Sequence, residues 1–188
     1  NLESTLPEEI WHLPSLESIT IYRTLLNGGI PPTAFVQNPN WTSIILYESS
    51  FGSSIPSTIG NLQKLRTFFI TGNKFTSTIP TEIGLCTLLA GFGVGHNSIE
   101  GRVPSELGLL TSLVTLGLQE NDWYGRLPTE LARLSALLEI LLSGNENLTG
   151  TIPQGMCRVV DGIGTVLIHL NQDSPLCDTC PKPCCSDC

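Results

Sequence analysis

An aliphatic residue followed by proline recurs along this chain at nearly constant intervals. The pairs are 24 or 25 residues apart: Leu6-Pro7, Ile30-Pro31, Ile55-Pro56, Ile79-Pro80, Val103-Pro104, Leu127-Pro128 and Ile152-Pro153. A fixed period of this length is typical of a solenoid, in which each unit is too small to bury its own apolar face and becomes stable by stacking on its neighbours. The sequence therefore predicts one elongated repeat domain.

Each period carries a second pattern, LxxLxxLxLxxNxL. In the third unit it is spelled by Leu62, Leu65, Phe68, Ile70, Asn73 and Phe75. The alternation within LxL points the apolar residues inward and the intervening residues outward, as a strand buried on one face requires. Proline then removes a ladder hydrogen bond and fixes its own backbone, so the chain leaves the strand there and returns along the opposite side. Each repeat is thus expected to add one short strand to a parallel sheet.

This spelling, followed by x-G-x-I-P-x-E-L-G as in residues 124–131, resembles the leucine-rich repeat family and its plant-type subclass. The resemblance covers residues 1–171. It implies an α/β repeat solenoid, a right-handed superhelix with a parallel β-sheet on the concave face and irregular or 3-10 segments on the convex side. Residues 172–188 are interpreted as a cysteine-rich cap. Because residues 1–7 match residues 147–153, the chain is expected to begin within a repeat of a longer protein.

An asparagine occupies one position of successive repeats, as Asn73, Asn97, Asn121, Asn145 and Asn171, whereas Thr24 and Ser49 stand there in the first two units. A buried asparagine can both donate to and accept from backbone groups, so we expect a ladder of hydrogen bonds between repeats that serves as scaffold and is looser at the N-terminal end. The last repeat is expected to continue through Val160, Ile163, Val166, Ile168 and Asn171.

If the strands stack in register, their outward residues form columns across the concave face. The first column is Thr20, Ile45, Phe69, Gly93, Gly117, Leu141 and Leu167; the second is Tyr22, Tyr47, Thr71, Gly95, Gln119, Ser143 and His169; the third is Arg23, Glu48, Gly72, His96, Glu120, Gly144 and Leu170. The core does not need these side chains, and exposed aromatic and aliphatic groups often mark a contact site. The candidate ligand-binding residues are Tyr22, Ile45, Tyr47, Phe69, Thr71, Gly93, Gly95, His96, Gln119 and Glu120. The glycines would either leave a shallow saddle for close approach of a partner or merely relieve crowding.

Six of the seven cysteines are predicted to form disulfides. Cys86 stands at a leucine position of its repeat and is expected to be a buried thiol, which leaves Cys157, Cys177, Cys180, Cys184, Cys185 and Cys188 in undetermined pairings. Disulfides would pin the tail over the open end of the last repeat. Zinc is the competing interpretation of this spacing, disfavoured because the tail has no histidine. The Cys-Cys ending is similar to that of secreted or surface leucine-rich repeat proteins of algae such as diatoms.

Two glycosylation sequons, at Asn40 and Asn147, agree with the cysteines and favour an extracellular or cell-surface location. The chain opens without the charged segment and apolar run of a signal peptide. A net charge of -8, with only 14% charged residues, argues against nucleic acid as a partner. Apolar stretches are too short for membrane insertion within this chain.

The sequence shows no convergent catalytic groups. His12, His96 and His169 lie on distant repeats, and His96 beside Glu120 is a conceivable acid–base pair that lacks a nucleophile. We expect no enzyme activity, cofactor or metal. Two arginines, Arg102 and Arg126, interrupt the hydroxyl rows of the convex side, which argues against ice binding.

The family resemblance implies a recognition domain, a receptor-like ectodomain or secreted protein that binds a protein, peptide or glycan on its concave face. A structural building block of an extracellular assembly or cell wall is an alternative, in which this face would serve permanent contacts with other extracellular proteins. An inhibitor of a cell-wall-degrading enzyme is another.

Overall fold

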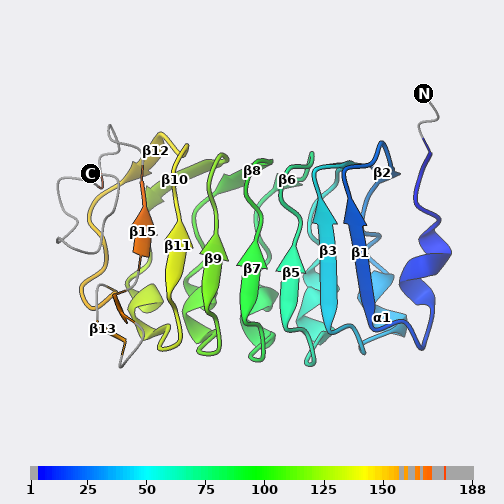
Figure 1. Cartoon of the computed structure of the whole chain (residues 1–188), viewed down its shortest axis with the longest axis horizontal. Coiled ribbons are helices and arrows are strands. Elements are labelled where there is room, and N and C mark those ends of the chain that lie inside the picture. Colours follow the sequence, from blue (N-terminus) through cyan, green and yellow to red (C-terminus); the bar gives the residue numbers. More distant parts are fainter. Residues whose placement is uncertain (1–3, 157–158, 161–163, 166, 171–175, 177–188) are drawn as a thin grey trace.

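The chain folds into a row of stacked coils in which strands line one side and short helices line the other (Figure 1). The structure, a computed structural model, describes residues 4–156, 159–160, 164–165, 167–170 and 176. Within this part, no helix is long and apolar enough to cross a membrane.

Seven parallel strands form the main sheet, in the order in which they occur along the chain. They are β1 (Ser18–Tyr22), β3 (Ser43–Tyr47), β5 (Thr67–Phe69), β7 (Gly91–Gly93), β9 (Thr115–Gly117), β11 (Glu139–Leu141) and β15 (Leu167–His169). Corresponding LxL residues pair across neighbouring strands, for example Phe68 with Phe92 and Phe92 with Leu116. The expected solenoid, with one strand per repeat and short 3-10 segments on the convex side, is therefore confirmed. We call the outward side of the main sheet the concave face.

The aliphatic-proline pairs start the convex segments, as expected. A five-residue 3-10 helix follows five of them: η1 (Glu8–His12), η2 (Ser57–Asn61), η3 (Thr81–Leu85), η4 (Ser105–Leu109) and η5 (Thr129–Arg133). Each begins with a hydrogen bond back to the proline carbonyl, such as Ile59 N–H to Pro56 O at 3.0 Å. The longer second unit forms α1 (Ala34–Gln37) instead. Buried Asn38, which follows α1, ties this segment to the preceding repeat by donating from Nδ2 to the carbonyls of Leu13 and Leu16.

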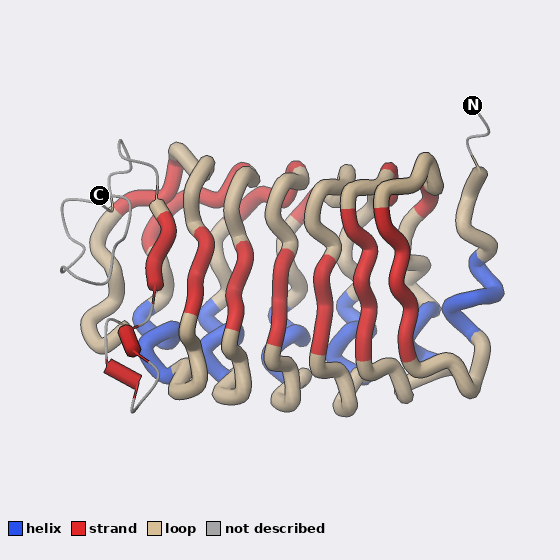
Figure 2. The backbone as a smooth tube through the Cα atoms, viewed as in Figure 1, coloured by secondary structure: helices blue, strands red, loops and turns tan. Residues whose placement is uncertain are grey.

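A second sheet follows the edge where the chain turns from the main sheet toward the convex side (Figure 2). Its parallel strands are β6 (Thr76–Ser77), β8 (Ser98–Gly101), β10 (Asp122–Arg126) and β12 (Asn147–Thr149). Two separate strand pairs are β2 (Asn27–Gly28) with β4 (Ser50–Phe51), which is parallel, and β13 (Val159–Val160) with β14 (Gly164–Thr165), which is antiparallel. The leucine pattern predicts one strand per repeat and therefore does not anticipate this sheet, whose short strands follow the LxL segment of each repeat.

One continuous apolar core runs between the sheet and the convex helices. Its largest fully buried side chains include Trp11, Trp41 and Trp123, and the rings of Phe68 and Phe92 stack with centroids 5.8 Å apart. Cys86 is buried as predicted, and its thiol donates to Ile59 O at 3.2 Å.

The asparagine ladder is confirmed for Asn73, Asn97, Asn121 and Asn145; Asn171 lies outside the described residues. Each Oδ1 accepts a backbone N–H of the preceding repeat, and each Nδ2 donates to a carbonyl of the preceding repeat and to carbonyls of its own repeat. In the first two units, Thr24 Oγ1 and Ser49 Oγ bond to each other at 3.2 Å instead. Buried amides therefore join consecutive coils in the described part of the solenoid.

The predicted register of the last repeat is wrong by two residues. Ile140 pairs with Ile168 and Leu141 with His169, whereas the sequence alignment placed Leu167 beside Leu141 and His169 beside Ser143. Ile168 and Leu170 are the buried residues of this strand, so Leu170 belongs to the core and not to the third outward column. A shift of two residues keeps every side chain on the same face, which is why alternation alone does not reveal it.

Candidate ligand-binding face

Four apolar candidates gather on the first three strands of the concave face. Tyr22 and Tyr47 are register partners on β1 and β3, and their ring centroids lie 5.6 Å apart at an interplanar angle of 49°. Ile45 on β3 pairs with Phe69 on β5 in the adjoining column. Tyr22 is 54% exposed, while the other three are half-buried. The structure thus brings these candidates together as one aromatic and aliphatic surface, which we call the tyrosine patch.

The glycines of β7 do not form an open saddle. A Cβ at Gly93 would stand 2.4 Å from the Phe69 ring, and a Cβ at Gly91 2.9 Å from it. On the other side, the Gln119 amide lies over Gly95, at 2.5 Å from a Cβ there. Gly93 and Gly95 are consequently buried under their neighbours. This favours the alternative that the glycines relieve crowding, since they make room for larger side chains of adjacent strands.

Gln119 follows β9 and fills the middle of the concave face. Its Oε1 is buried and has no hydrogen-bond partner in the described part of the chain. A buried amide oxygen without a donor is costly, so it is a ready acceptor for a ligand N–H that reaches it.

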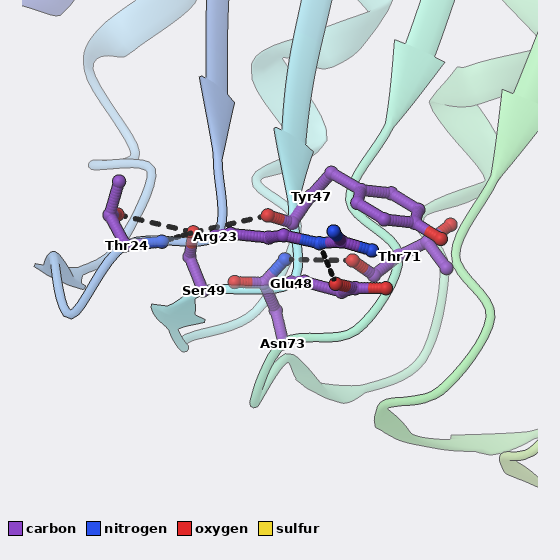
Figure 3. Close-up of polar contacts among 7 residues, drawn as sticks. All are labelled: Arg23, Thr24, Tyr47, Glu48, Ser49, Thr71 and Asn73. Atoms are coloured by element: carbon purple, nitrogen blue, oxygen red, sulfur yellow. Dashed lines mark hydrogen bonds and ion pairs between the residues drawn. The ribbon is translucent and has the colours of Figure 1, made fainter.

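The third column forms a rim where the chain leaves each strand (Figure 3). All six positions have left-handed backbone, with φ between 46° and 72°: Arg23, Glu48, Gly72, His96, Glu120 and Gly144. This conformation turns each strand end toward the next repeat; for example, Glu48 N–H donates to Thr71 O at 2.9 Å and His96 N–H to Gln119 O at 2.9 Å. The rim therefore displays charged side chains from a backbone that the hydrogen-bond ladder holds in place.

Arg23 and Glu48 form an ion pair on this rim, with Nε to Oε2 at 2.6 Å. The hydrogen bond from Arg23 and its positive charge lower the pKa of Glu48, and Tyr47 and His96 add to this effect. Both side chains are well exposed, so the pair orients charge beside Tyr47 more than it stabilises the fold.

His96 and Glu120 are not joined as an acid–base pair. The carboxylate of Glu120 lies against Gly144 of the following repeat, 2.3 Å from where a Cβ would stand there. His96 instead contributes to lowering the pKa of Glu48, and Gly72, which lies between the two residues on the rim, has no side chain.

Thr71 lies in the second column between Tyr47 and Gln119, and its carbonyl accepts the Glu48 N–H. Within the described residues, no group of three or more His, Cys, Asp or Glu side chains is arranged to hold a metal ion.

A close contact between a histidine and a carboxylate, at the C-terminal end of the sheet, was missed from the sequence. His169 Nε2 lies 3.2 Å from Glu139 Oε1, and both side chains are partly exposed. The two residues belong to β15 and β11, in which Glu139 pairs with Leu167 and Leu141 with His169. Counting repeats could not find this pair, because the last repeat is displaced by two residues from its expected alignment.

The two sequons differ in accessibility. Asn147 and Thr149 are exposed on β12 with Leu148 buried between them. Asn40 is half-buried and accepts a hydrogen bond from Lys64 Nζ at 2.9 Å, and Thr42 donates to Glu17 O at 3.0 Å. Asn147 is therefore the more accessible acceptor. The six cysteines predicted to form disulfides lie outside the described residues.

The fold is similar to that of extracellular leucine-rich repeat ectodomains. The ectodomain of the Arabidopsis thaliana receptor kinase GASSHO1/SCHENGEN3, in complex with CASPARIAN STRIP INTEGRITY FACTOR 2, is 30% identical, with a TM-score of 0.77 over 91% of this chain and 20% of that one. A TDR receptor is 32% identical, with a TM-score of 0.75 over 81% of this chain and 26% of that one. A chain of the Arabidopsis thaliana BIR3–SERK2 complex is 33% identical, with a TM-score of 0.61 over 70% of this chain and 69% of that one.

No family model and no curated protein matches the sequence. The chain spans about a fifth to a quarter of the first two ectodomains. Repeat spelling, strand register, asparagine ladder and structural likeness agree: this chain is a leucine-rich repeat domain.

Proposed function

We propose that this chain is the ligand-recognition part of an extracellular, receptor-like protein without catalytic activity, and that it binds a protein or peptide on its concave face. The tyrosine patch carries this proposal, because its side chains lie outside the core and are of the type that anchors interfaces. The likeness to receptor ectodomains, one of them in complex with CASPARIAN STRIP INTEGRITY FACTOR 2, supports it.

The polar neighbours of the tyrosine patch suit a peptide. The unpartnered Gln119 Oε1 would accept a backbone N–H, and the Arg23–Glu48 pair would meet polar groups at the rim. The remaining candidates, Thr71, Gly93, Gly95, His96 and Glu120, would contact the ligand or support those that do. Binding would combine apolar anchors at one end of the face with hydrogen bonding at its centre.

A library of random peptides displayed on phage tests this proposal. Peptides selected on the wild-type chain are then measured against Tyr47→Ala/Phe69→Ala, which removes two anchors. We expect affinity to fall roughly 30-fold, equivalent to about 2 kcal/mol. The control is Leu85→Ala/Leu109→Ala, which removes two exposed leucines from the convex side and should leave binding unchanged. Selected peptides that bind both double variants as tightly as wild type would reject the concave site.

A structural role is the second candidate, favoured by one observation. Leu85 and Leu109, the last residues of η3 and η4 on the convex side, are 54% and 49% exposed. Exposed leucines on neighbouring repeats could serve permanent contacts in an assembly. Light scattering after size-exclusion chromatography decides between the two: a monomer agrees with the recognition domain, and a large homopolymer that Leu85→Ala/Leu109→Ala dissolves would favour assembly.

A further inference from the structure

An exposed tyrosine lies beside the more accessible sequon on the second sheet. Strands β10 and β12 are parallel neighbours there (Figure 1), and Tyr124 is the register partner of Asn147. Register partners on adjacent parallel strands point their side chains to the same face of a sheet, about one strand separation of 4.8 Å apart. Leu148, the next residue along β12, is buried and points to the other face. Tyr124 and Asn147 therefore stand side by side on the outer surface.

The Tyr124 ring has no role in the core. Its side chain is 49% exposed, whereas Trp123 before it is fully buried. Among the described residues of β6, β8, β10 and β12, Tyr124 is the one exposed aromatic side chain. The residues at the same position of the two preceding repeats are Glu100 and Thr76. In these strands, an aromatic surface is thus exposed only where the neighbouring strand carries Asn147.

The Asn147 side chain is free to carry a glycan. Within the described part of the chain its amide makes no side-chain hydrogen bond, whereas Asn40 Oδ1 accepts one from Lys64 Nζ. Thr149, the hydroxyl residue of the same sequon, is exposed on the same face of β12. A sugar on Asn147 therefore has the Tyr124 ring as its neighbour on the side of β10.

We propose that Asn147 carries an N-linked glycan whose first N-acetylglucosamine stacks on the ring of Tyr124. The inference rests on the extracellular location in the proposed function, because the glycan is added in the secretory pathway. Asn147 Nδ2 bonds to the anomeric carbon of an oligosaccharide carried on a polyprenyl pyrophosphate. The bond from that carbon to the pyrophosphate oxygen breaks, the amide loses one proton, and the lipid pyrophosphate leaves.

The stacking follows from the chemistry of the two surfaces. One face of N-acetylglucosamine presents C–H groups, and the face of an aromatic ring is electron-rich, so the two faces attract each other. Contact also removes from water the apolar ring surface of Tyr124 that the fold leaves exposed. The first sugar is thereby held against the sheet rather than extended into solvent.

The glycan would protect the end of the second sheet. β12 is the last strand of this sheet among the described residues, and β10 is its one partner there. Unpaired strand edges are sites where another chain can add, and a bulky polar group on the edge strand opposes this. The concave face belongs to the main sheet, so the glycan leaves it open to a ligand.

The full chain, produced by secretion from a eukaryotic host, tests the assignment. Mass spectrometry of its peptides measures the occupancy of Asn147. High-mannose glycans are then trimmed with endoglycosidase H, which leaves one N-acetylglucosamine on the asparagine. Thr149→Val removes the sequon but keeps Asn147 and a β-branched side chain, so it gives the matched chain without the glycan. Tyr124→Ala removes the ring in both chains, and the control Tyr124→Phe keeps it.

We expect Asn147 to be occupied. Tyr124→Ala should lower the Tm of the trimmed glycosylated chain by about 2 °C more than it lowers the Tm of the Thr149→Val chain, whereas Tyr124→Phe should match wild type. In NMR spectra, the ring current should shift the N-acetyl methyl signal upfield in wild type and Tyr124→Phe but not in Tyr124→Ala.

An unoccupied Asn147 would overturn the inference. Equal losses of Tm in the two chains would also overturn it, as would an N-acetyl methyl signal that Tyr124→Ala leaves in place. Peptides selected for the concave face should bind Tyr124→Ala as tightly as wild type, so failure of this inference is distinguishable from failure of the proposed function.

Discussion

Asn97 shows how a single side chain couples two repeats. Its Oδ1 accepts the N–H of Phe75 at 2.9 Å, and its Nδ2 donates to Ile70 O and Val94 O, each at 2.9 Å. Ser49, at the same repeat position, has a shorter side chain that reaches Tyr47 O and the N–H of Thr24 at 3.2 and 3.3 Å. The amide therefore satisfies more backbone groups between coils than the hydroxyl does.

Replacing Asn97 with alanine should destabilise the chain by about 3 kcal/mol, because it leaves several backbone groups between two coils without partners. Ser49→Ala, the matched change at the other end of the ladder, should cost about 1 kcal/mol. Urea unfolding followed by circular dichroism gives both values. Equal losses would show that the ladder does not stabilise the solenoid through its amides.

At the scale of elements, neighbouring 3-10 helices approach closely through a glycine. A Cβ at Gly108 in η4 would stand 2.4 Å from the backbone oxygen of Glu130 in η5, and one at Gly84 in η3 would stand 2.8 Å from that of Glu106 in η4. Gly108 and Gly84 do not have left-handed backbone, so space rather than conformation requires glycine there. The glycine of the I-P-x-E-L-G spelling thus sets the distance between convex segments.

Gly108→Ala should therefore cost about 2–3 kcal/mol, because the new methyl group must push one helix away from the next. The control is Gly117→Ala on the concave face, where the nearest atom is the movable Oε1 of Gln119 at 3.2 Å. That variant should lose about 1 kcal/mol or less. Chemical denaturation measures both, and a Gly117→Ala chain less stable than Gly108→Ala would contradict this account.

The elements also show what the sequence can and cannot predict. Strands, convex turns and the ladder follow from a constant period, because stacked equivalent residues must meet. The register of the last strand does not follow from the period, because Ile168 satisfies the core pattern equally well in two registers that are two residues apart. On the candidate face, the columns were predictable, but the positions of Phe69 and Gln119 over the glycines depend on side-chain packing, which the period does not encode.

At the scale of the whole molecule, the buried thiol of Cys86 provides a way to test whether the other six cysteines form disulfides. Its side chain is fully buried between the third and fourth repeats, and burial raises the pKa of its thiol to about 12. The folded state thus favours the protonated thiol. This contribution to stability is present below the unfolded pKa of about 8.5 and is lost as the pH rises toward 12. Reaction of Cys86 with a thiol reagent consequently requires the coils around it to separate.

If the other six cysteines form disulfides, as we propose, a colourimetric thiol reagent should detect no thiol in the native protein at pH 8 and one per chain in denaturant. Addition of a reductant to the denatured chain should raise this count to seven. Cys86→Ala should lower the count in denaturant to zero while keeping the reductant-dependent six. Several reactive thiols in denaturant without reductant, or a count that a zinc chelator raises, would contradict the disulfides. Because thiolates are exposed to oxidation outside the cell, the same count tests the proposed extracellular location.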